Sequence, residues 1–215
     1  MSQIVVFGGN GYAGEHIVRE AVIRDHDVIC VSRSVPTTNV PGATYITGSI
    51  YDAGLLAQLA QQADVFISAV PSKSGDNRLP DGLNAIISAC VAHETRFGVV
   101  GGAGSLLVED EGPELRVAFA SALPEEAMPE INTHAELLGL LRNSPQDFDW
   151  FFLSPALLFG AHAPGEHRGV YRLGGDVMLT DQDGNSAISG TDYADAILDE
   201  IEHPKHRRTR FSVAY

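Results

Sequence analysis

The chain opens with a short apolar run that leads directly into a cluster of glycines. Residues 4–7 read Ile-Val-Val-Phe, and residues 8–14 read Gly-Gly-Asn-Gly-Tyr-Ala-Gly. An apolar run that ends at glycine predicts a strand buried on both faces. From Gly11 to about Arg24, apolar residues recur at helical spacing, which predicts an amphipathic helix. The order of strand, glycine turn and helix predicts the first half of a crossover between parallel strands.

The glycines have a spacing that suits phosphate binding. Both Gly9-x-Gly11-x-x-Gly14 and Gly8-x-x-Gly11-x-x-Gly14 are present. Glycine allows a turn with positive φ, lets the backbone approach a pyrophosphate, and lets the helix pack closely on the strand. The free N–H groups at the start of the helix then face the phosphates. The segment predicts an NAD(P) site whose contacts come from Gly8, Asn10, Gly11, Tyr12, Ala13 and Gly14.

The alternation of strands and helices continues along the chain. Short apolar runs predict strands at 28–31, 45–47, 65–70, 97–100, 150–153 and 211–214. Helical spacing predicts helices at about 52–60, 81–90, 131–141 and 193–201, with Asp52 and Thr191-Asp192 as N-caps. Such alternation is typical of a parallel sheet with helices on both faces. The sequence therefore predicts a single α/β domain over 1–215, a Rossmann-type doubly wound parallel sheet.

Two segments break this alternation. Residues 102–129 carry three prolines and many acidic side chains, and they predict a long loop on the active-site side of the domain. Residues 160–190 predict a small C-terminal β/α insertion, with strands at 170–173 and 177–179 followed by a polar turn at 181–185.

The end of the second predicted strand bears on which dinucleotide is bound. An NAD site usually carries Asp or Glu about 20 residues after the glycines, where it binds the ribose 2′-hydroxyl. This chain has Ser32-Arg33-Ser34 instead. A guanidinium can pair with a 2′-phosphate, and serine hydroxyls can add hydrogen bonds. We therefore expect NADP(H) to be favoured over NAD(H), with Arg33 and Ser34 as contacts; a solvated surface role for Arg33 is the alternative.

The charge balance is strongly acidic, with 28 Asp and Glu against 14 Lys and Arg and a formal net charge of −14. This balance disfavours nucleic acid and anionic membranes as partners. The basic run at 205–210 predicts a solvated helix end or loop. Cys30 and Cys90 lie in apolar runs and predict buried free thiols in a reducing compartment. No signal peptide and no membrane span is evident, so we expect a cytoplasmic protein.

Together these features resemble the atypical short-chain dehydrogenase/reductase superfamily, in particular its small NAD(P)H-binding, NmrA-like proteins. Beyond the glycine turn, the resemblance is carried by residues 48–52, 68–70, 99–105, 150–155 and 188–194. It implies that the adenine lies near Ser49 and Ile50, although Ser49 departs from the aspartate expected there. It also implies that the nicotinamide lies near Val70, Gly101, Gly102 and Pro155, with Ala69 as a further cofactor contact.

The chain departs from this superfamily in its catalytic residues. Its reductases typically use a Tyr-x-x-x-Lys pair and a serine on the fifth strand, and this sequence contains no Tyr-x-x-x-Lys. Aligned through the His-Ala-Glu segment, the tyrosine position falls near Met128, the lysine position near Asn132 and the serine position on Gly102. Ser105 and His134 remain as candidates for a catalytic polar group near the nicotinamide, with a structural role as the alternative for each.

The acidic and histidine patterns do not predict a metal site. Asp181-x-Asp183-x-Asn185 lacks the glycine position and the closing glutamate of a calcium loop, and it predicts a β turn. His203-x-x-His206 has no third ligand nearby in the sequence and predicts a solvated helix end.

Three functions fit these residues. The first is an NADPH-dependent reductase of a small flavin- or quinone-like acceptor, which receives a hydride from NADPH and can take its proton from water. The second is a non-catalytic NADP(H)-sensing regulatory protein that contacts a partner protein through the long acidic loop. The third is a nucleotide-sugar epimerase or dehydratase, although 215 residues leave little room for a substrate lobe. A homodimer is compatible with any of the three.

Overall fold

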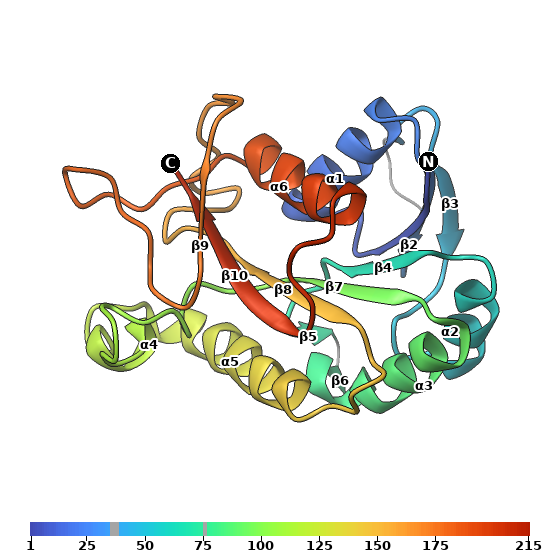
Figure 1. The fold of residues 1–215 in the computed structure, drawn as a ribbon, viewed down its shortest axis with the longest axis horizontal. Helices are drawn as coiled ribbons and strands as arrows, with labels where there is room; N and C mark the ends of the chain where they lie inside the picture. Colours follow the sequence, from blue (N-terminus) through green and yellow to red (C-terminus); the bar gives the residue numbers. More distant parts are fainter. Residues whose placement is uncertain (35–38, 75–76) are drawn as a thin grey trace.

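The computed structural model describes residues 1–34, 39–74 and 77–215 (Figure 1). Within these ranges, eight strands form one sheet in the order β3-β2-β1-β4-β7-β8-β10-β9, and β5 pairs with β6. The strands are β1 (Gln3–Phe7), β2 (Asp27–Ser32), β3 (Thr44–Thr47), β4 (Val65–Ser68), β5 (Lys73–Ser74), β6 (Asn77–Arg78), β7 (Arg96–Val100), β8 (Trp150–Ser154), β9 (Arg172–Gly174) and β10 (Thr209–Ala214). The α-helices are α1 (Tyr12–Ile23), α2 (Ala53–Ala60), α3 (Leu83–His93), α4 (Leu115–Ala118), α5 (Met128–Arg142) and α6 (Gly190–Glu202).

The strand order reverses at β1. Strands β1, β2, β3, β4, β7, β8 and β10 run parallel, and β9 pairs antiparallel with β10 at one edge. The chain builds outward from β1 to β2 and β3, and then crosses back to place β4 on the other side of β1. In open α/β sheets, ligands bind in the crevice at the carboxyl ends of the strands where the order reverses. The crevice between the ends of β1 and β4 is therefore the expected binding place.

Helices cover both faces of the sheet, as Figure 1 shows. Helices α1 and α6 lie together on one face, and α2, α3 and α5 lie on the other. The side chains of β1 alternate between two cores: Ile4 and Val6 pack in the first, Val5 and Phe7 in the second. A strand that is covered on both faces can be apolar throughout. These observations confirm the predicted Rossmann-type α/β fold.

One of the two predicted helix caps is present. The Asp52 carboxylate accepts the Leu55 N–H at 3.1 Å and caps α2 as predicted. The predicted Thr191-Asp192 cap is wrong, because α6 begins at Gly190 and Ser189 is its N-cap. The Ser189 hydroxyl accepts the Asp192 N–H at 3.0 Å and donates to the Asp192 carboxylate at 2.7 Å. A serine hydroxyl that accepts the N–H three residues on is a standard N-cap, so α6 begins before the Thr-Asp pair.

Residues 160–190 contain less regular structure than predicted. The strand expected at 170–173 is present as β9 with shifted bounds. The strand expected at 177–179 is wrong, since Val177 makes only an isolated bridge to Leu107. The Met178 N–H donates to the Leu107 carbonyl at 2.9 Å. The segment thus pairs with the long 102–129 connection instead of forming a hairpin of its own.

The 102–129 connection also carries structure that local pattern did not predict. It contains α4, a 3₁₀ turn at Glu125–Ala127 and the start of α5, which begins at Met128 rather than near Ile131. Pro129 stands in the first turn of α5, where its missing N–H costs nothing. The short β5–β6 pair was likewise not predicted, because two-residue strands have no periodicity to detect.

The basic run at 205–210 is not a solvated segment throughout. Arg210 is 4% exposed, and its Nε donates to Asp176 at 2.6 Å. Arg208 donates to the carbonyl oxygens of Ser144 and Phe148 at 2.9 and 2.8 Å. The prediction fails because β10 starts at Thr209 and carries the run into the sheet. By contrast, the β turn at 181–185 and the burial of both cysteines are confirmed.

Candidate functional site

A cavity of about 230 Å³ opens at the switch point of the sheet. It lies between the turns that follow β1, β2, β3 and β4. Its lining consists of Phe7, Gly8, Asn10, Gly11, Val31, Ser32, Arg33, Ser34, Gly48, Ser49, Ile50, Tyr51, Ala69, Val70 and Pro71. Most of the cofactor contacts expected from the sequence are in this set. The exceptions are Tyr12, Ala13, Gly14, Gly101, Gly102 and Pro155, which lie outside the lining.

At Gly8 and Gly14 the backbone of the protein itself leaves no room for a side chain. Gly8 has φ +83°, and a Cβ there would lie 2.5 Å from the Ala69 carbonyl oxygen. A Cβ on Gly14 would lie 2.2 Å from the Gly8 carbonyl oxygen. Both contacts are far inside van der Waals distance, so these glycines let α1 and the end of β4 pack against the turn.

Gly11 has a different reason to be glycine. It is the N-cap residue of α1, with φ −84° and ψ 170°, a conformation that any residue adopts. A Cβ there would meet its nearest neighbour, the Gly8 carbonyl oxygen, at an ordinary 3.4 Å. Apart from the adjoining residues, no other described atom lies within 4 Å of that Cβ, and Gly11 lines the cavity. The space is a cradle at a helix N-terminus, where an anionic phosphate binds favourably.

Asn10 organises the loop that follows β2. Its Nδ2 donates to the Ser32 hydroxyl at 2.9 Å and to the Ser34 carbonyl at 3.2 Å. The Ser32 hydroxyl in turn donates to the Ser34 carbonyl at 2.7 Å. These bonds join the glycine turn to the loop that carries Arg33. The polar residue between the glycines therefore has a structural task as well as a place in the cavity lining.

Arg33 supplies the cationic side chain of the cavity lining. The side chain is exposed, and no hydrogen bond or ion pair joins it to another residue within 1–34, 39–74 and 77–215. None of the described lining residues is Asp or Glu. Tyr51 lines the same cavity; burial and Asp81 raise the pKa of its hydroxyl, and the Arg33 charge opposes that rise. The guanidinium is thus available to an anionic ligand group.

Several lining residues were not expected from the sequence. Val31, Gly48 and Tyr51 flank the ends of β2 and β3, while Phe7 and Pro71 flank the ends of β1 and β4. The signal that could have found them is their position directly at the end of each apolar run. Tyr12, expected as a contact, has its hydroxyl engaged elsewhere: it donates to the Pro164 carbonyl and accepts the Gly190 N–H, both at 3.0 Å.

The two candidate catalytic residues have different surroundings. Ser105 is 5% exposed, and its carbonyl accepts from buried Arg210 at 3.3 Å. His134 is 7% exposed, with Nε2 3.0 Å from Glu130 and Nδ1 without a hydrogen-bond partner among the described residues. A Cβ on Gly102 would lie 3.3 Å from the Cβ of His134. Of the two candidates, His134 is therefore the one that packs against Gly102, just after the end of β7.

The positions expected for the catalytic tyrosine and lysine are occupied by Met128 and Asn132, which have neither a phenol nor an ammonium group. Met128 is the first residue of α5. The Asn132 side-chain oxygen accepts from Arg116 at 3.0 Å, which ties α5 to α4. The geometry therefore offers no hydroxyl–ammonium pair at these two positions.

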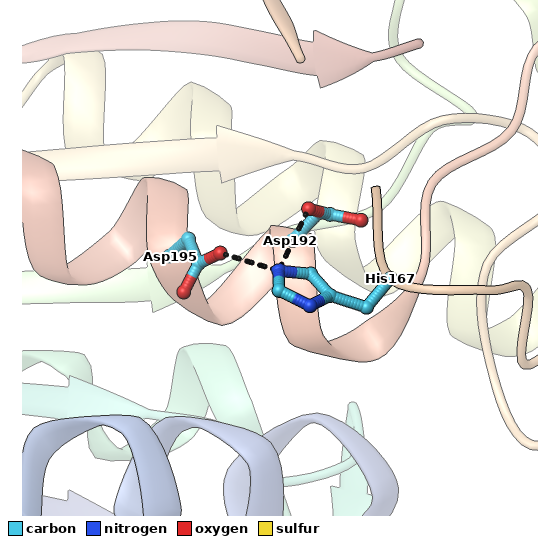
Figure 2. Close-up of side chains that lie close together, drawn as sticks. All are labelled: His167, Asp192 and Asp195. Carbon is cyan, nitrogen blue, oxygen red and sulfur yellow. Dashed lines mark ion pairs between the residues drawn. The ribbon is translucent and has the colours of Figure 1, made fainter. Parts of the chain in front are cut away.

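A second polar cluster joins the 160–171 segment to α6. Figure 2 shows His167 between two carboxylates of α6: its Nε2 lies 3.5 Å from Asp192 and 3.3 Å from Asp195. Burial and the nearby Glu20 carboxylate raise the pKa of Asp195 above its usual value. One imidazole and two carboxylates are donors that a divalent cation also uses. The same imidazole and carboxylates also form ion pairs with one another.

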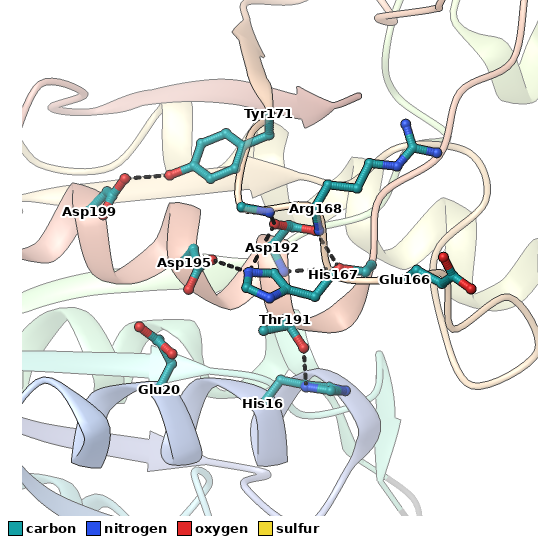
Figure 3. Close-up of polar contacts among 12 residues, drawn as sticks. His16, Glu20, Glu166, His167, Arg168, Tyr171, Thr191, Asp192, Asp195 and Asp199 are labelled. Carbon is teal, nitrogen blue, oxygen red and sulfur yellow. Dashed lines mark hydrogen bonds and ion pairs between the residues drawn. The ribbon is translucent and has the colours of Figure 1, made fainter.

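Asp192 accepts hydrogen bonds from several groups of the chain. Its carboxylate accepts the backbone N–H groups of Arg168 and Gly169 at 2.9 and 2.8 Å, and also the hydroxyls of Ser189 and Tyr215. Figure 3 shows His167 and Arg168 beside Asp192 at the start of α6. These hydrogen bonds satisfy the buried carboxylate, as burial of a charge requires. They also hold the 167–169 backbone on α6.

Comparison with known proteins decides the family. The family model described as NAD(P)H-binding matches residues 8–204. The chain belongs to the NAD(P)H-binding family. None of the helices in the described ranges is both long enough and apolar enough to cross a membrane.

Relatives of this NAD(P)H-binding protein cover its whole length. The uncharacterized protein YwnB of Bacillus subtilis is 34% identical over 213 residues, which span 98% of this chain and 97% of YwnB. A solved structure from Streptococcus pneumoniae, whose name proposes an NADH-flavin reductase, is 32% identical with a TM-score of 0.86 and covers 100% of this chain and 99% of that one. Another from Bacteroides thetaiotaomicron, whose name proposes an epimerase, is 32% identical with a TM-score of 0.84 and covers 100% and 97%.

Proposed function

We propose that this NAD(P)H-binding protein is a reductase that transfers hydride from NADPH to a small flavin- or quinone-like acceptor. The observation that carries the proposal is the cavity at the switch point, which unites the glycine turn, the start of α1 and the exposed Arg33. The name given to the Streptococcus pneumoniae relative supports reductase chemistry on this fold.

The lining fits a dinucleotide with a 2′-phosphate. The space that a Cβ on Gly11 would fill, at the uncapped N-terminus of α1, suits a pyrophosphate. Arg33 and the Ser32 and Ser34 hydroxyls, on the loop held by Asn10, suit the 2′-phosphate. An Asp or Glu, which would bind a free ribose 2′-hydroxyl and repel a phosphate, does not occur among the described lining residues. NADP(H) is therefore the preferred cofactor in this proposal.

The residues at the nicotinamide end restrict the acceptor. When bound, NADPH supplies a hydride, so the acceptor gains two electrons and needs one further proton. Gly102, Met128 and Asn132 occupy the places where the superfamily has its serine, tyrosine and lysine. No residue at these places can protonate the alkoxide that an ordinary ketone forms. A reduced flavin or quinone spreads its negative charge over the ring, so solvent can protonate it.

The test is NADPH oxidation with a panel of acceptors. We expect riboflavin or a naphthoquinone to turn over faster than simple ketones and aldehydes by about 10²-fold or more, because a positioned general acid contributes about 10²–10⁴-fold. The Gly11→Val variant, which we expect not to bind the cofactor, serves as the blank. Equally fast carbonyl reduction would contradict the acceptor assignment. Tight NADPH binding without turnover of any acceptor would favour the sensor instead, and conversion of a nucleotide sugar would favour an epimerase.

A further inference from the structure

The turn that leaves β4 is held by a carboxylate from a distant helix. Ser72 directly follows Val70 and Pro71, which line the cavity, and it is 2% exposed. Both carboxylate oxygens of Glu130, in the first turn of α5, lie 3.0 Å from the Ser72 backbone nitrogen. Glu130 also accepts the Ser72 hydroxyl. Removing the carboxylate would leave a buried N–H without its partner, which is costly in a folded protein.

His134 holds Glu130 in turn. It lies one helical turn further along α5, and its imidazole packs edge-to-face on Phe152 at 6.3 Å between ring centroids. Burial acts in the opposite direction, but the hydrogen bonds from His134 and Ser72 lower the pKa of Glu130 to about 2. Glu130 is therefore ionised at neutral pH, and the Nε2–H of His134 donates to it at 3.0 Å. Donors from Ser72 and His134 together restrict the rotation of the carboxylate.

The topology places this arrangement at one end of the cavity. Arg33 follows β2, on one side of β1, and the turn at Val70 follows β4, on the other side. Gly102, against which His134 packs, follows β7, the next strand beyond β4. A dinucleotide that lies across these strand ends with its 2′-phosphate at Arg33 has its nicotinamide half toward β4 and β7. Glu130 therefore acts on the half of the site where hydride leaves.

We infer that Glu130, supported by His134, is a positioning residue that fixes the turn of Val70, Pro71 and Ser72 against the nicotinamide. The inference rests on the proposed function, because it takes Arg33 as the 2′-phosphate contact and hydride transfer as the reaction. A turn held in place sets the distance and angle of hydride transfer, and a displacement of about 1 Å can cost roughly 10²-fold in rate.

The experiment compares Glu130→Gln with Glu136→Gln. Glu136 lies on the same helix, and its carboxylate pairs with Arg78 at 2.8 Å at the surface. Two ligands separate the halves of the site: NADPH, and 2′,5′-ADP, which has the 2′-phosphate but no nicotinamide. We expect Glu130→Gln to bind 2′,5′-ADP like the parent, to alter the fluorescence of bound NADPH, and to lower kcat by about 10- to 100-fold. Glu136→Gln should match the parent in all three measurements.

The outcomes distinguish this inference from the function on which it rests. Equal weakening of both ligands by Glu130→Gln would mean a general structural role, and an unchanged fluorescence with unchanged kcat would mean none; either result overturns the inference. If Glu130→Gln does not fold, Ser72→Ala is used instead, because it removes the hydroxyl contact to Glu130 and keeps the backbone N–H contact. It should change the fluorescence of bound NADPH and leave the binding of 2′,5′-ADP unchanged. A parent that reduces no acceptor contradicts the proposed function, and the two-ligand comparison then decides the role of Glu130 by itself.

Discussion

At the scale of single residues, Gly11 is a glycine that the fold does not need but the proposed pyrophosphate site does. Gly8 and Gly14 cannot carry a Cβ without collision, whereas Gly11 can. We therefore expect Gly11→Val to fold like the parent and to lose NADPH binding, because the branched side chain occupies the pyrophosphate space. Binding is measured by NADPH fluorescence, and Gly139→Val is the control, since a Cβ at Gly139 meets no atom within 4 Å. An unchanged NADPH titration of Gly11→Val would show that the glycine turn is structural only.

Arg33 is the residue on which cofactor preference depends. A charge-assisted hydrogen bond contributes about 1.5–3 kcal/mol, which corresponds to roughly one to two orders of magnitude in affinity. Arg33→Ala should lose that much affinity for NADPH and little for NADH, measured as the two dissociation constants. The control is Arg19→Ala, because Arg19 is also an exposed arginine but lies on α1 and outside the cavity lining. Equal losses for both cofactors, or a parent that prefers NADH, would refute the assignment.

At the scale of elements, α5 joins the turn after β4 to the body of the domain through Glu130. Because the pKa of Glu130 is about 2 in the folded protein, below its ordinary value of 4.5, its contribution to stability is complete above about pH 4.5. The contribution is lost as the pH falls toward 2. The difference in unfolding free energy between the parent and Glu130→Gln should therefore shrink on acidification, measured by urea unfolding at neutral pH and down to about pH 3. A difference that stays constant with pH would show that the carboxylate charge is not involved.

At the scale of the whole molecule, a buried ion pair joins β7 to α6. Arg96 donates to the Glu200 carboxylate at 2.6 Å and to the Glu200 and His206 carbonyls at 2.9 and 2.7 Å. The two side chains are 8% and 4% exposed. Arg96→Met should lower the unfolding free energy by about 3 kcal/mol, because it takes the guanidinium away from a buried carboxylate. Among the described residues, that carboxylate then keeps only the His206 imidazole and the N–H groups of Lys205 and His206. The measurement is denaturant unfolding.

A matched surface pair provides the control for Arg96. Arg19 pairs with Glu15 at 2.8 Å, and the two side chains are 53% and 52% exposed. Arg19→Met should cost at most about 1 kcal/mol, since water solvates both charges when the pair is broken. Similar costs for the two substitutions would show that the burial of Arg96 adds nothing.

The candidate site was predicted best where its residues follow one another in the sequence. Gly8, Asn10 and Gly11 line the cavity as expected from a local motif between a strand and a helix. Ser49 and Val70 were placed by resemblance, and they also line it. Glu130 was not predicted as a site residue, because its partner Ser72 is 58 residues away and no spacing pattern links the two. The solvated role predicted for Arg210 failed for a similar reason, since its partner Asp176 lies 34 residues earlier.

The sequence by itself determined the class of fold and the place of the glycine turn. Buried strands and amphipathic helices are recorded in short-range apolar spacing, and glycines mark turns through local backbone geometry. Only the tertiary structure decided which turns meet at the cavity and that Glu130 holds the end of β4. These contacts depend on the order of strands in the sheet, and that order is set by the summed packing of both cores rather than by any local segment.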